Sequence, residues 1–420
     1  MSQQIKETVS PIVRSTYEKL MENKTIQETL KFIESDHRRT VEEQIAITEI
    51  PAPPFKEEVR ARNVKKRLED LSLSDVRMDK EGNVYGVKHG TGYGPKIFIS
   101  AHLDTVFPEG TDVGVAKKGR ILSAPGISDD TRGLAELLAA IRAVNQTNLP
   151  IIGDVVFGAT VGEEGAGDLR GVKAFFDENK DIDGFISIDG PDVSSIIYLG
   201  TGSYRYTIIF KGDGGHSFGA FGIPSATHAL GRAIAAISDF KTKEDPKTTF
   251  TVGEVWGGTS VNAIAAEAGM TVDLRSNDQT ELKQLEEELL RVIHESVEAE
   301  NARWESNRLT VEINRFGNRP PASQPSEAPI VEAAFGAIEK IVGKPSLVGA
   351  VSTDANHPMS LGIPSITIGL GGKSGGTHTL DEWYDPTEAY IGIQKNFLTI
   401  LGLVGVEGVC EPLLGRREDT

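Results

Sequence analysis

The sequence predicts an α/β fold: a mixed, mostly parallel sheet sandwiched by helices, with a smaller α+β domain inserted into it. Three apolar strands, at 97–99, 154–161 and 185–188, each lead to a histidine or an acidic residue, and helical segments separate them. Continuous apolar runs of this kind are typical of parallel strands, which are buried on both faces. Near Gly200 the strands begin to alternate, and the first pattern returns after Pro325, which predicts the insertion.

Length and composition narrow the class of protein. A chain of 420 residues is too long for one compact core, so two domains are expected. Its net charge of -17 argues against nucleic acid and anionic membrane as partners. The single cysteine, Cys410, excludes an intrachain disulfide and a thiolate-rich zinc cluster. We see no apolar signal segment and no run of membrane-spanning length, so we expect a cytoplasmic protein.

The N-terminal elements are expected in the following order. Residues 1 to 36 are polar with helical spacing and are expected to be a surface appendage. The next segments are a helix from His37 that ends before Pro51, an amphipathic helix over 55–71, and a hairpin over 79–87 that leads into the strand at Ile97.

The insertion is predicted as two strand–helix–strand units. Its expected elements are strands at 205–211, 252–256, 270–275 and 309–314, and helices at 226–237 and 282–297. We expect residues 1–201 and 319–420 to form the main domain and residues 202–318 the inserted one, with the proline-rich segment 318–325 as a linker. The α/β pattern then resumes with a helix over 328–342 and a strand over 365–369.

Metal-competent side chains follow the predicted strands. His102 and Asp104 alternate at the end of an extended segment, so they point to the same side. Asp129 and Asp130 come just before an apolar-periodic helix, whose N-terminus stabilises carboxylates. The next strands lead to three further acids: Glu163, Glu164 and Asp189. Carboxyl ends of parallel strands meet at one edge of the sheet, so these groups are expected to converge.

Each of these signals has a structural alternative. A Glu-Glu pair is usually solvated, and an acid at a strand end is usually a helix cap. Their joint occurrence favours a cation, because converging carboxylates repel one another without one. Histidine with carboxylate, and no thiolate, suits zinc, cobalt or manganese and leaves positions for water. Two such ions about 3.5 Å apart can share a carboxylate, as in aminopeptidase-type sites.

The motifs resemble those of the co-catalytic di-zinc exopeptidases, a family that includes peptidase T, glutamate carboxypeptidase, succinyl-diaminopimelate desuccinylase and the aminoacylases. The resemblance rests on His102-Leu103-Asp104-Thr105-Val106, Asp129-Asp130, Gly162-Glu163-Glu164-Gly165, Asp189 and Thr377-His378-Thr379. It covers almost the whole chain from about residue 38, including the insertion.

The resemblance implies two zinc ions, with cobalt or manganese as alternatives. His102 and Asp189 would bind one ion, and His378 and Glu164 the other, with Asp129 bridging both. Further roles follow from the same resemblance: Asp104 orienting the ring of His102, Glu163 as general base, and a cis peptide bond between Asp129 and Asp130.

The inserted domain resembles the family's lid, which closes over substrate and forms homodimers. By resemblance, His216 would stabilise the oxyanion, and Asn262 and Arg275 would contact substrate. A turn histidine and an exposed strand arginine are the structural alternatives. The strand 205–211 is a candidate edge strand that could pair with a second copy of the chain. The structural alternative is a lid whose edge is covered and which stays monomeric. His357 lies near the site by resemblance without an assigned role.

We therefore expect a metal-dependent exopeptidase that hydrolyses short peptides through a water bound by two zinc ions. An N-acyl-amino-acid amidohydrolase uses the same bond chemistry and remains an alternative. A catalytically inactive peptide-binding protein is a more remote one, and the intact Asp104 and Glu163 argue against it. The sequence leaves open which end of the peptide is read.

Overall fold

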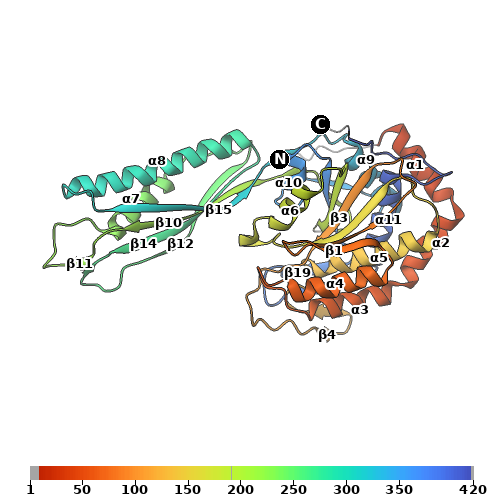
Figure 1. Cartoon of the computed structure of the whole chain (residues 1–420), viewed down its shortest axis with the longest axis horizontal. Helices are drawn as coiled ribbons and strands as arrows, with labels where there is room; N and C mark the ends of the chain where they lie inside the picture. The colour runs from red at the N-terminus through yellow and green to blue at the C-terminus, as the bar shows by residue number, and fades with distance from the viewer. Residues whose placement is uncertain (1–8, 191, 418–420) are drawn as a thin grey trace. The chain divides into compact units, whose positions relative to one another are not determined.

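The computed structural model describes residues 9–190 and 192–417. The chain divides into two compact units, residues 1–200 with 323–420, and residues 201–322, and we describe each by itself (Figure 1). The short strands β9 (Leu199–Gly200) and β16 (Ala322–Ser323) lie where the units divide. The first residues, on which the expected absence of a signal segment rests, lie outside the described part. Within that part, no helix combines the length and apolar character needed to cross a membrane.

An eight-stranded mixed sheet forms the centre of the first unit, in the order β1-β2-β6-β3-β7-β18-β8-β17. Its strands are β1 (Ser74–Met78), β2 (Val84–Lys88), β3 (Lys96–His102), β6 (Asp154–Thr160), β7 (Gly184–Gly190), β8 (Ser195–Ile197), β17 (Ser346–Val348) and β18 (Ser365–Gly369). The central strands β6, β3, β7 and β18 are mutually parallel. The expected fold class, a mostly parallel mixed sheet, is confirmed.

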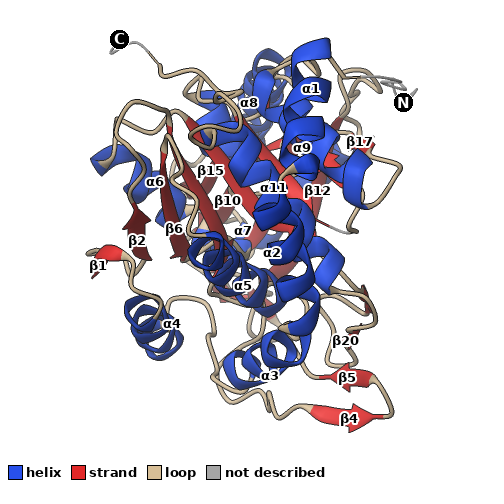
Figure 2. Ribbon diagram, turned by 90° about the vertical axis from the view of Figure 1, so that its right-hand side faces the viewer, coloured by secondary structure: helices blue, strands red, loops and turns tan. Residues whose placement is uncertain are grey.

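Helices cover both faces of this sheet because the side chains of its strands alternate. Ile97 and Ile99 of β3 belong to the large core, whereas Phe98 between them faces a second core and stacks on Phe175, with ring centroids 3.8 Å apart. The helices of the unit are α1 (Pro11–Glu22), α2 (Lys24–Ser35), α3 (His37–Thr48), α4 (Glu58–Asp70), α5 (Thr131–Thr147), α6 (Arg170–Glu178), α9 (Pro329–Ile341), α10 (Asn356–Ser360) and α11 (Tyr390–Val404). Figure 2 shows α2, α5 and α11 side by side, in agreement with their contacts.

The expectation that residues 1–36 form a surface appendage is wrong for their described part. Helices α1 and α2 pack on α5, α9 and α11, and they bury Tyr17, Leu20 and Ile33 in the large core. The Tyr17 hydroxyl donates a hydrogen bond of 2.7 Å to the carbonyl oxygen of Ala333. The apolar stripe of these helices is visible in the sequence, but the surface that it covers is formed by α5, α9 and α11, which come much later in the chain.

Because one face of α1 is buried, a substitution that shortens a side chain on that face should measurably lower the stability of the protein. Leu20→Ala leaves a cavity in the core and is expected to lower the free energy of unfolding by about 2–5 kcal/mol. Ile12→Ala, in the same helix but with 67% of the side chain exposed, is the matched control and should change it little. Urea denaturation measures both. Equal, small effects would show that α1 contributes nothing to the core.

Three smaller differences from the expected elements concern turns and pairing. Helix α4 begins at Glu58 rather than at Phe55. The hairpin predicted over 79–87 begins earlier, at Ser74: it is the pair β1 and β2, with residues 79–83 as its turn, and β2 pairs with β6. A separate small sheet joins β4 (Ala116–Lys118), β5 (Ile121–Ser123), β19 (Lys373–Gly375) and β20 (Trp383–Asp385).

The second unit is a four-stranded antiparallel sheet in the order β12-β14-β10-β15, with two helices on one face. Its elements are β10 (Gly202–Lys211), β12 (Thr248–Gly257), β14 (Glu267–Ser276), β15 (Thr310–Arg319), α7 (Ala226–Ser238), α8 (Gln279–Arg303) and the short pair β11 (Gly215–His216) and β13 (Ala263–Ile264). Ile208 and Phe210 of β10 belong to the core beneath the helices.

Two expectations for this unit are wrong. The strand at 205–211 is not an edge, because β10 pairs with β14 on one side and β15 on the other. The edge strands are β12 and β15. The predicted linker begins too early, since Asn318 and Arg319 are still paired with β10.

Candidate metal centre and active site

The parallel strands bring the predicted side chains to one edge of the sheet. His102 is the last residue of β3, and β3 pairs in parallel with β6 on one side and with β7 on the other. The loop after β6 carries Glu164, and Asp189 lies near the end of β7. His378 lies in the turn between β19 and β20.

Asp129 lies between the two histidine rings. Its Oδ1 is 3.0 Å from Nε2 of His102, and its Oδ2 is 3.0 Å from Nε2 of His378. The same His378 nitrogen is 2.8 Å from Oε1 of Glu164, while Nε2 of His102 is 3.9 Å from Oδ1 of Asp189. The structure thus brings together all five predicted ligands. It also contains the cis peptide bond between Asp129 and Asp130 that the resemblance implied.

Among the described residues, three groups have ligand atoms close enough to hold a cation. Their atoms lie within 4.8 Å of one another, and the groups are His102 with Glu163 and Glu164, His102 with Asp130 and Asp189, and Asp129 with Glu164 and His378. The carboxylate of Asp130 already accepts the backbone N–H groups of His102, at 2.9 Å, and Gly133, at 3.1 Å. Asp130 therefore caps α5 and holds the end of β3.

Neighbouring carboxylates favour the protonated form of both histidines. Burial lowers the pKa of His102, but its hydrogen bond to Asp129 and the charge of Asp130 raise it well above its usual range. Hydrogen bonds to Asp129 and Glu164 raise the pKa of His378 to about 10. Burial also raises the pKa of Asp189. Because metal binding displaces such protons, a nitrogen and carboxylate donor set held in this way fits a divalent cation.

Asp104 orients this site in a different way from the one expected. The Nδ1 of His102 donates to the backbone carbonyl oxygen of Asp104 at 2.9 Å, while the Asp104 carboxylate lies 3.8 Å away. The fully buried carboxylate instead accepts the backbone N–H groups of Glu163, at 3.1 Å, and Glu164, at 2.9 Å. Since a carbonyl only accepts, Nδ1 carries a proton, and Nε2, which faces Asp129, is the nitrogen that a ligand bond would use. The Asp104 carboxylate fixes the Glu163–Glu164 loop.

Our sequence reasoning missed Glu382, a fully buried carboxylate at this site. It accepts hydrogen bonds from the loop that ends in Asp129, including the Asp129 backbone N–H at 3.1 Å. An acid four positions after the metal-competent His378 was the available signal, but it resembles an ordinary solvated residue in the sequence.

His357 lies outside the ligand cluster. It belongs to α10 and packs against Phe176 of α6, with ring centroids 6.5 Å apart. Burial and the charge of Lys173 lower its pKa to about 4. Its surroundings therefore favour the neutral ring, and we assign it a packing role.

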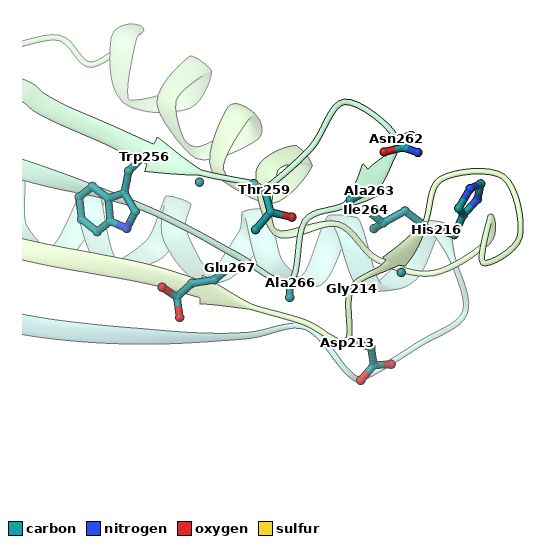
Figure 3. A pocket seen from close by; sticks show the side chains of 13 residues that line it. Asp213, Gly214, His216, Trp256, Thr259, Asn262, Ala263, Ile264, Ala266 and Glu267 are labelled. Carbon is teal, nitrogen blue, oxygen red and sulfur yellow. The ribbon is translucent and has the colours of Figure 1, made fainter.

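The second unit places His216 and Asn262 at one pocket of about 930 Å³ (Figure 3). His216 ends β11 and Asn262 lies just before β13, and the Ser217 N–H donates a hydrogen bond of 2.9 Å to the Asn262 carbonyl oxygen. The Nδ1 of His216 accepts the N–H groups of Phe218 and Gly219, so the proton of a neutral ring lies on Nε2.

Arg275 does not line this pocket. It lies toward the other end of β14, where its Nε donates to Oδ2 of Asp273 at 2.7 Å. The three predicted substrate-contacting residues of the insertion thus occupy two places within their own unit.

The fold and the cluster define a metal-dependent hydrolase: a parallel sheet edge gathers the buried His102, the exposed His378 and several carboxylates around Asp129. Residues 98–400 match peptidase family M20/M25/M40, so the chain belongs to that family and is a metallopeptidase.

Solved structures share this fold at low sequence identity. Aminopeptidase PepT from Bacillus cereus ATCC 10987 is 24% identical, with a TM-score of 0.71 over 87% of this chain and 98% of that one. A tripeptidase from Staphylococcus aureus is 21% identical, with a TM-score of 0.72 over 87% and 97%. A dinuclear metal-binding M20 peptidase from Bacillus subtilis is 18% identical, with a TM-score of 0.65 over 88% and 99%. No curated protein sequence matches the chain.

Proposed function

We propose that the protein is a di-zinc exopeptidase that hydrolyses short peptides. The observation that carries the proposal is Asp129, whose two carboxylate oxygens each lie 3.0 Å from a different histidine Nε2. Two adjacent ions can share a carboxylate that is placed in this way. We assign His102 and Asp189 to one ion and His378 and Glu164 to the other, with cobalt or manganese as alternatives.

The chemistry divides between the metal centre and Glu163. Bound zinc ions would polarise the scissile carbonyl and acidify the attacking water. Glu163 takes a proton from that water as its oxygen attacks the carbonyl carbon, and then gives the proton to the departing amine. Glu163 suits this role because it is buried beside His102 and Glu164 and its backbone is fixed by Asp104.

The inserted unit is proposed to supply contacts to substrate. The outward Nε2–H of His216 is a donor for the oxyanion that forms in the transition state. Asn262 and Arg275 are proposed to bind the peptide, with the guanidinium suited to a carboxylate. An N-acyl amino acid offers the same amide and carboxylate, so an amidohydrolase remains the alternative.

The test is hydrolysis of a panel of unblocked dipeptides and tripeptides, their N-acetylated and C-amidated forms, and N-acyl amino acids. An exopeptidase cleaves the unblocked peptides, and the block that stops cleavage identifies the end that is read. Preferred cleavage of N-acyl amino acids would establish the amidohydrolase. No cleavage of any compound by metal-loaded protein would contradict both. The same preparation carrying Glu163→Gln controls for contaminating peptidases.

We further propose a homodimer formed through the inserted unit. Its edge strand β12 leaves backbone groups unpaired on one side and exposes 57% of Val255 and 38% of Trp256. Exposed edges of this kind pair readily with another strand. The loops beside His216 also expose Phe218 and Val261. A second copy would cover these apolar groups and bring His216 to its partner's active site.

His216→Ala is expected to lower kcat strongly while zinc content stays unchanged, because the residue donates to the transition state and binds no metal. His294→Ala, which changes another exposed histidine of the same unit, should leave kcat unchanged. Mixed His216→Ala and Glu163→Gln subunits should regain part of the activity, since one active site of the hybrid is intact. Sedimentation showing an active monomer would exclude action on the partner's site. An unimpaired His216→Ala enzyme would exclude the role itself.

A further inference from the structure

Glu382 lies immediately before β20 and is completely buried. Its carboxylate accepts four hydrogen bonds from one loop. The donors are the Gly126 N–H at 2.8 Å to Oε2, and, to Oε1, the Ser128 N–H at 2.8 Å, the Ser128 hydroxyl at 2.6 Å and the Asp129 N–H at 3.1 Å. This loop ends in the acid that lies between the two histidine rings.

The small sheet explains how Glu382 reaches this loop. Trp383 of β20 pairs with Ser123 of β5, so the preceding residue lies beside the start of the loop. The Ala124 N–H also donates to the backbone oxygen of Glu382 at 3.2 Å. On the other side, the Glu382 N–H donates to the Thr379 oxygen at 3.2 Å, which closes a turn directly after His378. One residue is therefore bound to the segments that carry Asp129 and His378.

A carboxylate is the side chain that this position requires. All four groups that face it are donors, and an ionised carboxylate only accepts. An amide in its place would direct N–H groups at some of these donors, and a buried donor without an acceptor is costly. The loop would then shift, and with it the Asp129 carboxylate, which lies 3.0 Å from the ring of His378.

We propose that Glu382 is a positioning residue that sets the spacing between Asp129 and His378 and thereby the affinity of the site for zinc. The inference rests on the proposed metal-binding roles of those two residues. Hydrogen-bonding partners of metal ligands typically change metal affinity by about 10- to 100-fold when they are replaced. Glu382 differs from a direct ligand because it touches the ligand segments and not the space between the rings.

Glu382→Gln is expected to weaken zinc binding about 10- to 100-fold, measured with zinc alone in competition with a chromophoric chelator. At saturating zinc, the variant should regain most of its kcat with KM unchanged. Asp385→Asn is the matched control: the same chemical change three residues later, at a carboxylate that binds Arg120 and Thr387 instead of the metal loops. Its zinc affinity should equal that of the wild type.

Unfolding of the metal-free proteins separates positioning from a structural role. A lower Tm with unchanged zinc affinity per folded molecule would overturn the proposal. Should Glu382→Gln fail to fold, Ser128→Ala removes one donor and keeps the loop backbone. Weaker zinc binding in Ser128→Ala would support positioning, and wild-type affinity would overturn it. A wild-type protein that binds no zinc would contradict the proposed function rather than the role of Glu382.

Discussion

Glu163→Gln is expected to lower kcat by about a hundred- to ten-thousand-fold while the fold and the zinc content stay unchanged. Glutamine keeps the size of the side chain but cannot take the proton of the attacking water. The backbone of the residue would still be held by Asp104, because that bond uses the Glu163 N–H. Single-turnover rates and zinc content per chain measure both parts of the expectation.

Glu164→Gln is the adjacent control, since it makes the same chemical change at a proposed ligand. Its Oε1 is 2.8 Å from Nε2 of His378, so the loss of charge should weaken zinc binding first. Excess zinc should restore activity to Glu164→Gln and not to Glu163→Gln. If the two variants behave alike, the roles of the pair have been assigned wrongly.

Removal of the metal should abolish activity completely, and zinc, cobalt or manganese should restore it. The proposed chemistry needs a cation to polarise the carbonyl, and the ligand set of histidines and carboxylates suits all three ions. Dialysis against a chelator followed by titration with each ion, with peptide hydrolysis as the readout, tests this. Undiminished turnover in a preparation shown to be free of metal would contradict the proposed function.

The zinc affinity measured in this titration should depend on pH. The pKa of His378 is raised to about 10 in the metal-free site, so a proton occupies the ring at neutral pH and zinc must displace it. Apparent zinc affinity should therefore increase as pH rises toward that value and fall as pH is lowered. A pH-independent affinity between pH 6 and about pH 9 would show that His378 is not a ligand.

Several parts of this protein were determined by local sequence. The apolar strand before His102 and the acid pair before α5 predicted a parallel sheet edge with metal-competent groups, and the structure brings those groups together. This worked because carboxyl ends of parallel strands meet at one edge whatever the order of the strands. Alternation likewise predicted the strands of the second unit, because it depends only on which face is buried.

Tertiary structure alone decided the features that depend on which segments meet. The apolar stripe of α1 is local, but its burial depends on α9 and α11. The pattern of β10 is the same at an edge or in the middle of a sheet, since alternation reports the faces of a strand and not its neighbours. Glu382 is distinguished from a solvated acid only by four donors from a loop more than 250 residues earlier. The spacing of apolar residues in the sequence indicates which face of a helix or strand is buried. Hydrogen bonds between residues distant in sequence form only when the chain folds, so local sequence does not indicate them.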